Sequence, residues 1–341
     1  MKSIIFYLGC DHLKEELETQ LIINGVQPIE MGEVNTQIFS DGEVCTDFIT
    51  SVRGKRVFIV SSPNNSDKLI QLNMAIDAAK RAAAKEIIPI IPYFPYARQD
   101  KKDQSRGPIG AKVVAEMIQN RGATSIITFD LHADQIQGFF DIPVTHMEGK
   151  FLFDKTIFNR YNEYNGQVVL CSPDAGAAKR VKGIHDRLKD KFDIDLPMVL
   201  IHKTRSVANK VDEMILIGDV KDKHVIVIDD MADTCGTLVK ACETLLENGS
   251  TGVTSIVTHG VLSGPALERL FDAIADPRSP KVMEEFICSD TLPLPNKEVF
   301  VEQGVYARPE QFITVISVAG QIARAIKAID ENVSIEDLKK K

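Results

Sequence analysis

The stretch that decides the fold is Val225–Leu238, which reads VIVIDDMADTCGTL. A short apolar run, Val225–Ile228, ends abruptly in two carboxylates, Asp229 and Asp230. After a loop of small residues, apolar side chains recur at helical spacing until Gly249 closes the run. The pattern predicts a buried strand, a turn and an amphipathic helix. That succession is the repeating unit of an α/β fold with a mostly parallel sheet.

The loop between this strand and helix consists of Asp233, Thr234, Cys235, Gly236 and Thr237. Ligands of parallel α/β sheets bind at the carboxyl ends of strands, and a helix N-terminus there offers N–H donors and partial positive charge to a phosphate. The two carboxylates before the loop would repel a phosphate, so we expect them to bind sugar hydroxyls or a cation. The loop therefore predicts a site for a phosphorylated sugar. A plain solvated turn is the competing interpretation, but it does not require three Asp and two Thr in nine positions.

Length and charge set broad limits on the chain. Its 341 residues predict two domains, which we place at residues 1–149 and 150–330, followed by a polar tail at 331–341. The net charge of −8 argues against nonspecific nucleic-acid binding, which needs clustered positive charge.

The cysteines and the apolar runs bear on location. The six cysteines are scattered and none forms a CxxC pair, so neither a zinc site nor a disulfide framework is predicted. Reduced thiols favour a cytoplasmic location. The first apolar run is too short for a signal peptide, and no window reaches the length of a membrane span. We therefore expect no membrane partner.

The two halves of the chain contain three similar segments in the same order. They pair FIVSSPN at 58–64 with VVLCSPD at 168–174, the strand before YAR at 96–98 with the strand before KTR at 203–205, and ITFDLHADQ at 127–135 with IVIDDMADT at 226–234. We infer that one α/β unit was duplicated. In this alignment the first copy has exchanged the phosphate loop for a histidine, His132.

Several charged residues at strand ends are candidates for chemistry. Lys203 and Arg205 lie just beyond a strand, at the edge of the sheet that carries the sugar loop, and cations there stabilise phosphoryl transfer. Lys179, Arg180 and Lys182 instead lie within a helix and are interpreted as a solvated face.

Other candidates carry weaker signals. His132 and Asp174 each read as ordinary strand-end or turn residues, and a His ligand is unusual for Mg²⁺. Phe39 beside the turn at 41–43 offers a ring for stacking on a purine, although a surface turn is equally consistent. Arg98 and Gln99 add candidate phosphate and base contacts. No Walker loop and no GxGxxG occurs, so a nucleotide would not be held in a P-loop or Rossmann manner.

Eight motifs, in order along nearly the whole chain, resemble those of the ribose-phosphate pyrophosphokinase family, whose members are also called phosphoribosyl-diphosphate (PRPP) synthetases. They are FSDGE (39–43), YFPYARQDKKDQSR (93–106), DLHADQIQGFFDIPV (130–144), SPDAGAAKRV (172–181), HKTR (202–205), GDV (218–220), DDMADTCGT (229–237) and THGVLSGPA (258–266). The resemblance implies two duplicated α/β domains of the type I phosphoribosyltransferase fold. It also implies diphosphoryl transfer from ATP to the 1-hydroxyl of D-ribose 5-phosphate, giving PRPP and AMP.

The resemblance assigns roles to individual residues. It implies that ATP is bound by Phe39, Asp41, Gly42, Glu43, Arg98, Gln99 and His132, with the adenine contacted across a subunit interface. It implies catalytic roles for Lys203, Arg205 and His132, and a Mg²⁺ held by His132 and Asp174. Ribose 5-phosphate would be bound by Arg205, Asp229, Asp230, Asp233, Thr234, Cys235, Gly236 and Thr237. The family also implies a homo-oligomer, a hexamer assembled from dimers.

Four features depart from the family pattern: Ala177 stands where members usually have a second Gly, SDKLIQL in the helix at 67–84 differs from the usual string, and two further segments differ in regions that bear on regulation. Thr145–Glu148 reads THME where members often have Asp-Asn-Leu-Tyr, and the C-terminus ends in EDLKKK. Because both regions contribute to regulation in the family, we hypothesise altered or absent control by phosphate and ADP. Two alternatives stay open: a catalytically silent regulatory subunit, and a diphosphokinase that acts on a larger ribose-phosphate acceptor. A phosphoribosyltransferase is disfavoured because nothing suggests a nucleobase hood.

Overall fold

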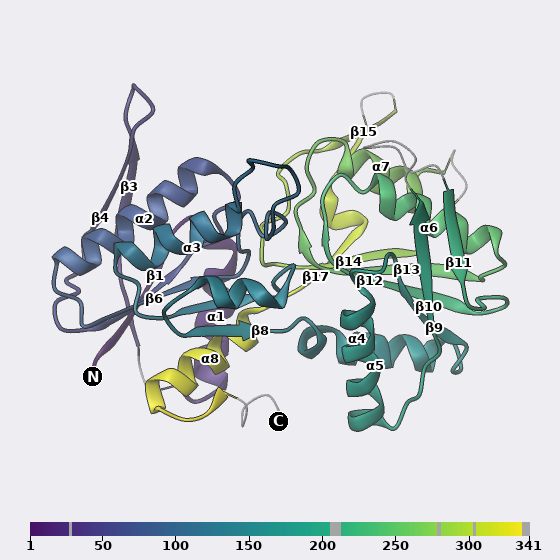
Figure 1. Cartoon of the computed structure of the whole chain (residues 1–341), viewed down its shortest axis with the longest axis horizontal. Helices are drawn as coiled ribbons and strands as arrows, with labels where there is room; N and C mark the ends of the chain where they lie inside the picture. Colours follow the sequence, from purple (N-terminus) through teal and green to yellow (C-terminus); the bar gives the residue numbers. More distant parts are fainter. Residues whose placement is uncertain (27–28, 205–212, 278–280, 303–304, 336–341) are drawn as a thin grey trace. The chain divides into compact units, whose positions relative to one another are not determined.

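The computed structural model describes residues 1–26, 29–204, 213–277, 281–302 and 305–335 (Figure 1). The chain divides into two compact units. Unit 1 comprises Met1–Glu148, Thr291–Pro293 and Ser317–Lys341, and unit 2 comprises Gly149–Asp290 and Leu294–Ile316. Among the described residues, no helix is long and apolar enough to cross a membrane.

Unit 1 is built on a six-stranded sheet in which every neighbouring pair is parallel. In spatial order its strands are β2 (Glu30–Met31), β1 (Ser3–Tyr7), β5 (Arg56–Val60), β6 (Glu86–Ile91), β7 (Ile126–Phe129) and β8 (Val144–Met147). The helices are α1 (Asp11–Ile23), α2 (Ser66–Arg81), α3 (Gly110–Arg121) and α8 (Ala319–Glu331), with a short 3-10 helix η1 (Asp134–Phe139). All five residues of β5 are buried, as expected of a parallel strand covered on both faces.

A β-hairpin of unit 1 stands apart from this sheet. Within the described part of the chain, its strands β3 (Val34–Ile38) and β4 (Val44–Phe48) pair with each other alone, and β4 packs on α2 (Figure 1).

Unit 2 is built on a seven-stranded sheet that is parallel except for one edge strand, β11. Its spatial order is β11 (Glu213–Ile217), β10 (Met198–Thr204), β9 (Val168–Ser172), β12 (His224–Ala232), β13 (Gly252–Gly260), β14 (Glu285–Ser289) and β17 (Ile313–Ile316). The helices are α4 (Lys150–Glu163), α5 (Ala178–Phe192), α6 (Gly236–Glu247) and α7 (Ala266–Ile274). A two-stranded ribbon, β15 (Val299–Glu302) and β16 (Val305–Ala307), and the 3-10 helix η2 (Pro309–Gln311) complete it.

The strand order supports a duplication but corrects the alignment of the two halves. The runs β2-β1-β5-β6-β7-β8 and β10-β9-β12-β13-β14-β17 have the same order of connection, so β1 corresponds to β9 and β5 to β12. The alignment from sequence had instead matched β5 with β9 and β7 with β12. The sequence alignment matched the wrong strands because parallel strands at different positions in a sheet end in similar small and polar residues. The counterpart of the sugar loop in unit 1 is therefore Ser61–Asn65, and not the segment that carries His132.

The corrected correspondence also accounts for the composition of the two units. Helix α4 follows β8, the last strand of the first sheet, but packs on α5 in unit 2. Helix α8 follows β17, the last strand of the second sheet, but packs on α1 in unit 1, where Arg56 Nη1 donates to the carbonyl oxygen of Ile329 at 2.8 Å. Each half thus contributes its last helix to the other unit. Unit 2 therefore ends at Ile316, whereas the predicted second domain, 150–330, includes α8.

Candidate functional site

Asp229 and Asp230 lie inside strand β12 rather than in a turn after it, which corrects the expected end of the strand at Ile228. The strand continues to Ala232, and Asp229 is still in register with Val257 of β13. Because successive residues of a strand point to opposite faces, the two carboxylates leave the backbone on different sides of the sheet. The pair is therefore held by a rigid ladder rather than by a loop.

Arg180 is a cation of this site that the sequence analysis assigned to a solvated surface. Its side chain is only 15% exposed, and its Nη1 lies 3.9 Å from Asp230 Oδ1. Arg180 belongs to the first turn of α5, which packs on the face of the sheet toward which Asp230 points. The alternation of Asp229 and Asp230 in a strand, read together with a basic residue at the start of the preceding helix, was the available signal.

Burial raises the pKa of Asp229 to about 8, and the negative charge of neighbouring Asp230 acts in the same direction. The Asp229 carboxyl therefore holds a proton near neutral pH in the ligand-free molecule. A protonated carboxyl both donates and accepts hydrogen bonds, whereas an ionised one only accepts. The pair can therefore offer a donor and several acceptors to the hydroxyls of a sugar.

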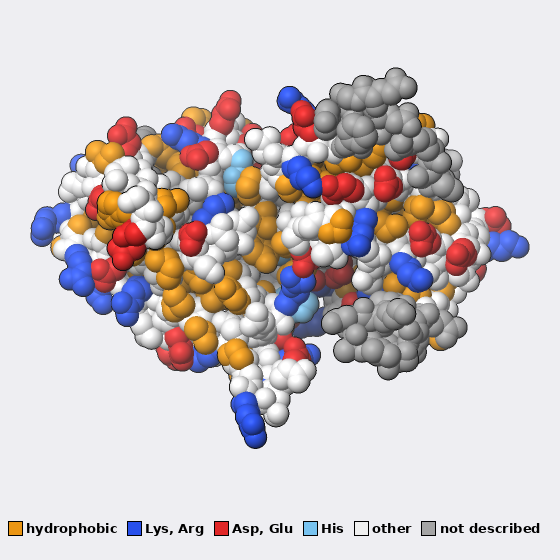
Figure 2. All heavy atoms as spheres, turned by 90° about the horizontal axis from the view of Figure 1, so that it is seen from above, with side chains coloured by type: hydrophobic (Ala, Val, Ile, Leu, Met, Phe, Trp, Pro, Cys, Tyr) orange, Lys and Arg blue, Asp and Glu red, His pale blue; other side chains and the backbone are white. Residues whose placement is uncertain are grey.

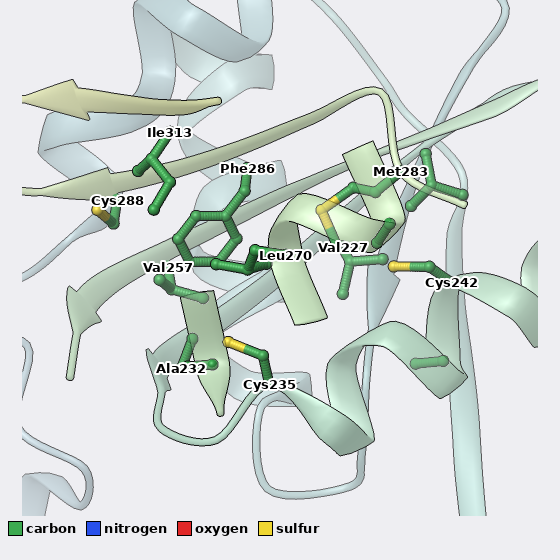
Figure 3. Packing of buried hydrophobic residues seen from close by; sticks show 14 of the residues in the cluster. Val227, Ala232, Cys235, Cys242, Val257, Leu270, Met283, Phe286, Cys288 and Ile313 are labelled. Carbon is green, nitrogen blue, oxygen red and sulfur yellow. The ribbon is translucent and has the colours of Figure 1, made fainter. Parts of the chain in front are cut away.

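The phosphate loop begins α6 through a residue in a left-handed conformation. Cys235 has φ +60°, and helix α6 starts at Gly236. The Cys235 side chain is buried among Ala232, Phe286 and Cys288 in the core of unit 2 (Figure 3). Burial raises the pKa of this thiol to about 12, so it stays neutral. Of the predicted ribose-phosphate ligands, Cys235 can thus offer its backbone N–H but not its side chain.

Ser263 and Arg269, which follow β13 in the chain, hold this loop in place. The sequence analysis assigned neither residue a role. Ser263 donates from Oγ to Asp233 Oδ1 and from its backbone N–H to the Asp233 carbonyl oxygen at 3.1 Å. Arg269 Nη1 donates to the Thr234 carbonyl oxygen at 2.7 Å, and a Cβ added at Gly236 would lie 2.9 Å from the same nitrogen. The guanidinium therefore lies directly beside the N-terminus of α6, where it adds positive charge to a phosphate site.

Lys203 and Asp174 come together at the carboxyl end of the same sheet. Lys203 lies near the end of β10, and its Nζ is 3.4 Å from Asp174 Oδ2. Asp174 follows β9, and its other oxygen, Oδ1, accepts from the backbone N–H of Ala177 at 3.1 Å. The lysine side chain is only 12% exposed, so neighbouring residues cover most of it. Arg205, the second predicted cation, lies outside the described residues.

The predicted adenine residues form the tip of the β3–β4 hairpin in unit 1. Phe39 N–H donates to the Glu43 carbonyl oxygen at 2.8 Å, Asp41 Oδ1 accepts from Glu43 N–H at 3.0 Å, and Gly42 has φ +90°. The Phe39 ring is 44% exposed. The tip thus has a defined turn and presents an uncovered aromatic ring beside two acidic residues.

The remaining predicted nucleotide residues follow β6 and β7 of unit 1. Gln99 accepts at its carbonyl oxygen from Ala111 N–H at 3.2 Å, which ties it to α3, and Arg98 precedes it with an exposed side chain. His132 is also exposed and lies in the loop between β7 and η1. Both segments leave the sheet at the carboxyl ends of adjacent parallel strands, so they share one edge of unit 1.

The two residues predicted to hold Mg²⁺ offer one imidazole and one carboxylate. The predicted ligand His132 belongs to unit 1 and Asp174 to unit 2. No group of three or more His, Cys, Asp or Glu able to hold a metal ion occurs among the residues that the structure describes. In phosphoryl-transfer sites Mg²⁺ keeps several waters and uses one or two carboxylates plus substrate phosphates. Asp174 supplies a carboxylate of the kind that such a cation uses.

Comparisons with known proteins cover most of the chain. The family profile of the N-terminal domain of ribose phosphate pyrophosphokinase matches residues 5–122, and that of the phosphoribosyl transferase domain matches residues 144–276. The crystal structure of phosphoribosylpyrophosphate synthetase from Mycobacterium smegmatis is 35% identical, with a TM-score of 0.80, over 97% of this chain and 100% of that one. Hypoxanthine phosphoribosyltransferase from Trypanosoma cruzi is 18% identical, with a TM-score of 0.27, over 32% of this chain and 61% of that one.

Proposed function

The chain belongs to the ribose-phosphate pyrophosphokinase family and is a ribose-phosphate diphosphokinase, and from that premise we propose that ATP is its donor and D-ribose 5-phosphate its acceptor. The 1-hydroxyl of the sugar attacks the β-phosphorus of ATP. The bond between the α- and β-phosphates breaks, the β,γ-diphosphate moves to the sugar as PRPP, and AMP leaves. The proton of the attacking hydroxyl is lost in the same step.

The observation that carries this proposal is the acceptor site in unit 2. A helix N-terminus at Gly236 with Arg269 beside it suits the 5-phosphate, while Asp229 and Asp230 on the preceding strand suit the ribose hydroxyls. The two carboxylates would repel the negatively charged 5-phosphate, so they do not bind that end of the sugar. This polarity orients the sugar with its hydroxyls toward β12 and its phosphate toward α6.

Lys203 supplies positive charge for the transferring diphosphate. Its Nζ already lies beside Asp174, so it is held at the strand edge before substrates bind. Charge in phosphoryl transfer spreads over oxygens in a loose transition state, and a fixed cation stabilises it without a covalent intermediate. Arg205 is proposed as a second cation for the same charge and for the sugar phosphate.

For the nucleotide, we assign the hairpin tip and the segments after β6 and β7 in unit 1. Phe39 would stack on the adenine, with Asp41, Gly42 and Glu43 around it, and Arg98, Gln99 and His132 would contact the remainder of ATP. His132 and Asp174 would hold the Mg²⁺ that accompanies the nucleotide. When bound, Mg²⁺ neutralises negative charge on the phosphates.

The function is tested by asking which nucleotide product appears. With Mg²⁺, ATP and ribose 5-phosphate, we expect AMP and PRPP in equal amounts, measured by chromatography and ³¹P NMR. Omission of the sugar should abolish AMP formation. Replacement of the sugar by 2-deoxyribose 5-phosphate should weaken it strongly, because a hydroxyl that the carboxylates bind is lost. Formation of ADP instead of AMP would mean transfer of a single phosphoryl group and would refute the proposal.

We also propose that the enzyme is a cytoplasmic homo-oligomer. A groove of about 750 Å³ lies between α2, α3 and β4 of unit 1, and it is lined by the exposed apolar side chains of Ile70, Met74 and Val113. Exposed apolar surface of this kind is typical of association sites. Figure 2, which views the molecule from above, shows apolar side chains gathered in patches between scattered acidic and basic ones.

Charge placed in this groove is expected to dissociate the oligomer. Val113→Glu, at a position 47% exposed on α3, would bury an unpaired carboxylate if a second copy covers the groove, so we expect a smaller species in sedimentation equilibrium. Ile215→Glu is the matched control, because Ile215 is 45% exposed on β11 of unit 2. If Val113→Glu sediments with the wild-type mass, the groove is not an interface between copies.

A further inference from the structure

We propose that His146 is a positioning residue that holds the loop carrying His132 in the conformation that meets the nucleotide. The inference rests on the proposed nucleotide role of His132. His146 lies in β8, within the THME segment that departs from the family pattern.

The contact is a side-chain hydrogen bond to the backbone of the loop. The Leu131 N–H donates to His146 Nε2 at 2.9 Å. One residue earlier, the Asp130 N–H donates to the Met147 carbonyl oxygen at 2.8 Å. Strand β8 thus holds the two residues immediately before His132, the first through its backbone and the second through an imidazole.

The conformation of the loop explains why a side chain is needed there. Strand β7 ends at Phe129, and Asp130 has φ +35°, close to the left-handed region that non-glycine residues rarely adopt. That turn takes the following N–H out of line with the ladder, and His146 supplies its acceptor. Leu131 is 3% exposed, so this hydrogen bond lies in a mostly buried part of the loop.

The imidazole also faces the far end of the same loop. Because Nε2 accepts from Leu131, the ring proton of the neutral imidazole resides on Nδ1. Nδ1 lies 3.9 Å from Asp134 Oδ1 and 3.4 Å from Gln137 Nε2, both in η1. Because Nδ1 carries the proton, its N–H faces the Asp134 carboxylate, whereas Gln137 Nε2 is itself a donor and makes a packing contact only. His146 therefore lies between the residue before His132 and the short helix after it. The His146 side chain is only 8% exposed, so its orientation is set by packing as well as by these contacts.

A loop fixed at both sides of an exposed side chain presents that side chain in one place, which lowers the entropic cost of binding. Loss of the acceptor at position 146 should leave the fold of β8 intact and release the loop. We therefore expect weaker nucleotide binding and unchanged recognition of the sugar phosphate. The expected loss is on the order of tenfold in affinity for ATP.

Three variants of the full-length enzyme separate this role from a merely structural one. His146→Leu removes the acceptor with a similar volume, and His146→Gln retains an acceptor oxygen near the place of Nε2. Thr145→Val changes the neighbouring residue of the same strand on the opposite face and serves as the control. Each variant is measured for Mg–ATP affinity by calorimetry without sugar, for the KM of ribose 5-phosphate, and for hydrogen exchange of the peptide covering residues 130–137.

For His146→Leu we expect about tenfold weaker ATP binding, faster exchange of that peptide and an unchanged KM for ribose 5-phosphate. His146→Gln and Thr145→Val should resemble the wild type in all three measurements. Wild-type ATP affinity and wild-type exchange in His146→Leu would overturn the inference, and so would equal weakening by Thr145→Val. Failure of the proposed function is a different result, since it appears as absence of AMP from the wild-type enzyme.

Discussion

Lys203→Ala is expected to lower the rate of AMP formation by on the order of 10² to 10³. The Nζ of Lys203 lies at the carboxyl end of the sheet beside Asp174, where charge accumulates on the transferring diphosphate. Alanine at this position would supply no positive charge. Because the interaction is strongest in the transition state, we expect the loss in kcat and only a small change in the KM of ribose 5-phosphate.

A matched lysine in the same unit controls for charge and stability. Lys223 immediately precedes β12 and therefore lies at the amino-terminal end of that strand, away from the carboxyl ends that carry the site, and its Nζ lies 3.4 Å from Asp219 Oδ2. Lys223→Ala should retain wild-type turnover, and both variants should unfold within a few degrees of the wild type in a thermal scan. If Lys203→Ala forms AMP at the wild-type rate, this lysine does not stabilise the transferring charge.

Asp229→Asn is expected to stabilise the ligand-free protein while it weakens sugar binding. Burial first, and the charge of Asp230 second, raise the pKa of Asp229 from 3.8 to about 8. Below about pH 4 the folded and unfolded chains both hold this proton, so asparagine confers no advantage. Between about pH 4 and 8 the unfolded chain releases the proton and the folded chain retains it, so the wild type loses stability as pH rises. The advantage of the Asp229→Asn variant should therefore grow over this window and stay constant above it.

We expect a gain on the order of a few kcal/mol at about pH 8, measured as the free energy of unfolding in urea at several pH values. The KM of ribose 5-phosphate should rise at least about tenfold, because an amide cannot replace a carboxyl toward two hydroxyls. Asp219→Asn is the contrasting control. A hydrogen bond from the Lys221 backbone N–H lowers the pKa of Asp219, so its replacement should bring no gain with rising pH. A pH-independent effect of Asp229→Asn would show that this carboxyl does not hold its proton in the folded state.

The stretch Val225–Leu238 shows which structural features a local sequence pattern can predict and which it cannot. Apolar residues followed by helical spacing identified a strand and a helix correctly, because both patterns arise from burial on a sheet and on one face of a helix. The end of the strand was misplaced by four residues, since β12 continues through Asp229 and Asp230 to Ala232. Carboxylates usually end a strand, but here the ladder to β13 extends past them. Helices α4 and α7 and strand β8 were not anticipated at all.

The duplication shows the same limit at a larger scale. Similar strand ends indicated two copies, and the two sheets do share one order of connection. The pairing of strands could not be obtained that way, because many parallel strands end in Ser, Pro or Asp. The exchange of α4 and α8 between the units was equally hidden, since an amphipathic helix records that it packs but not on which sheet.

By itself, the sequence determined the class of fold, the family and the identity of most candidate residues. It could do so because the residue types in a short motif indicate which kind of ligand a loop can bind. Only the tertiary structure decided which side chains meet. It brought Arg180 to Asp230, Arg269 to the phosphate loop, Lys203 to Asp174 and His146 to Leu131. These pairs join residues from 15 to 50 positions apart. Their proximity depends on strand order and helix packing, which arise from burial of whole surfaces rather than from any one short stretch of the chain.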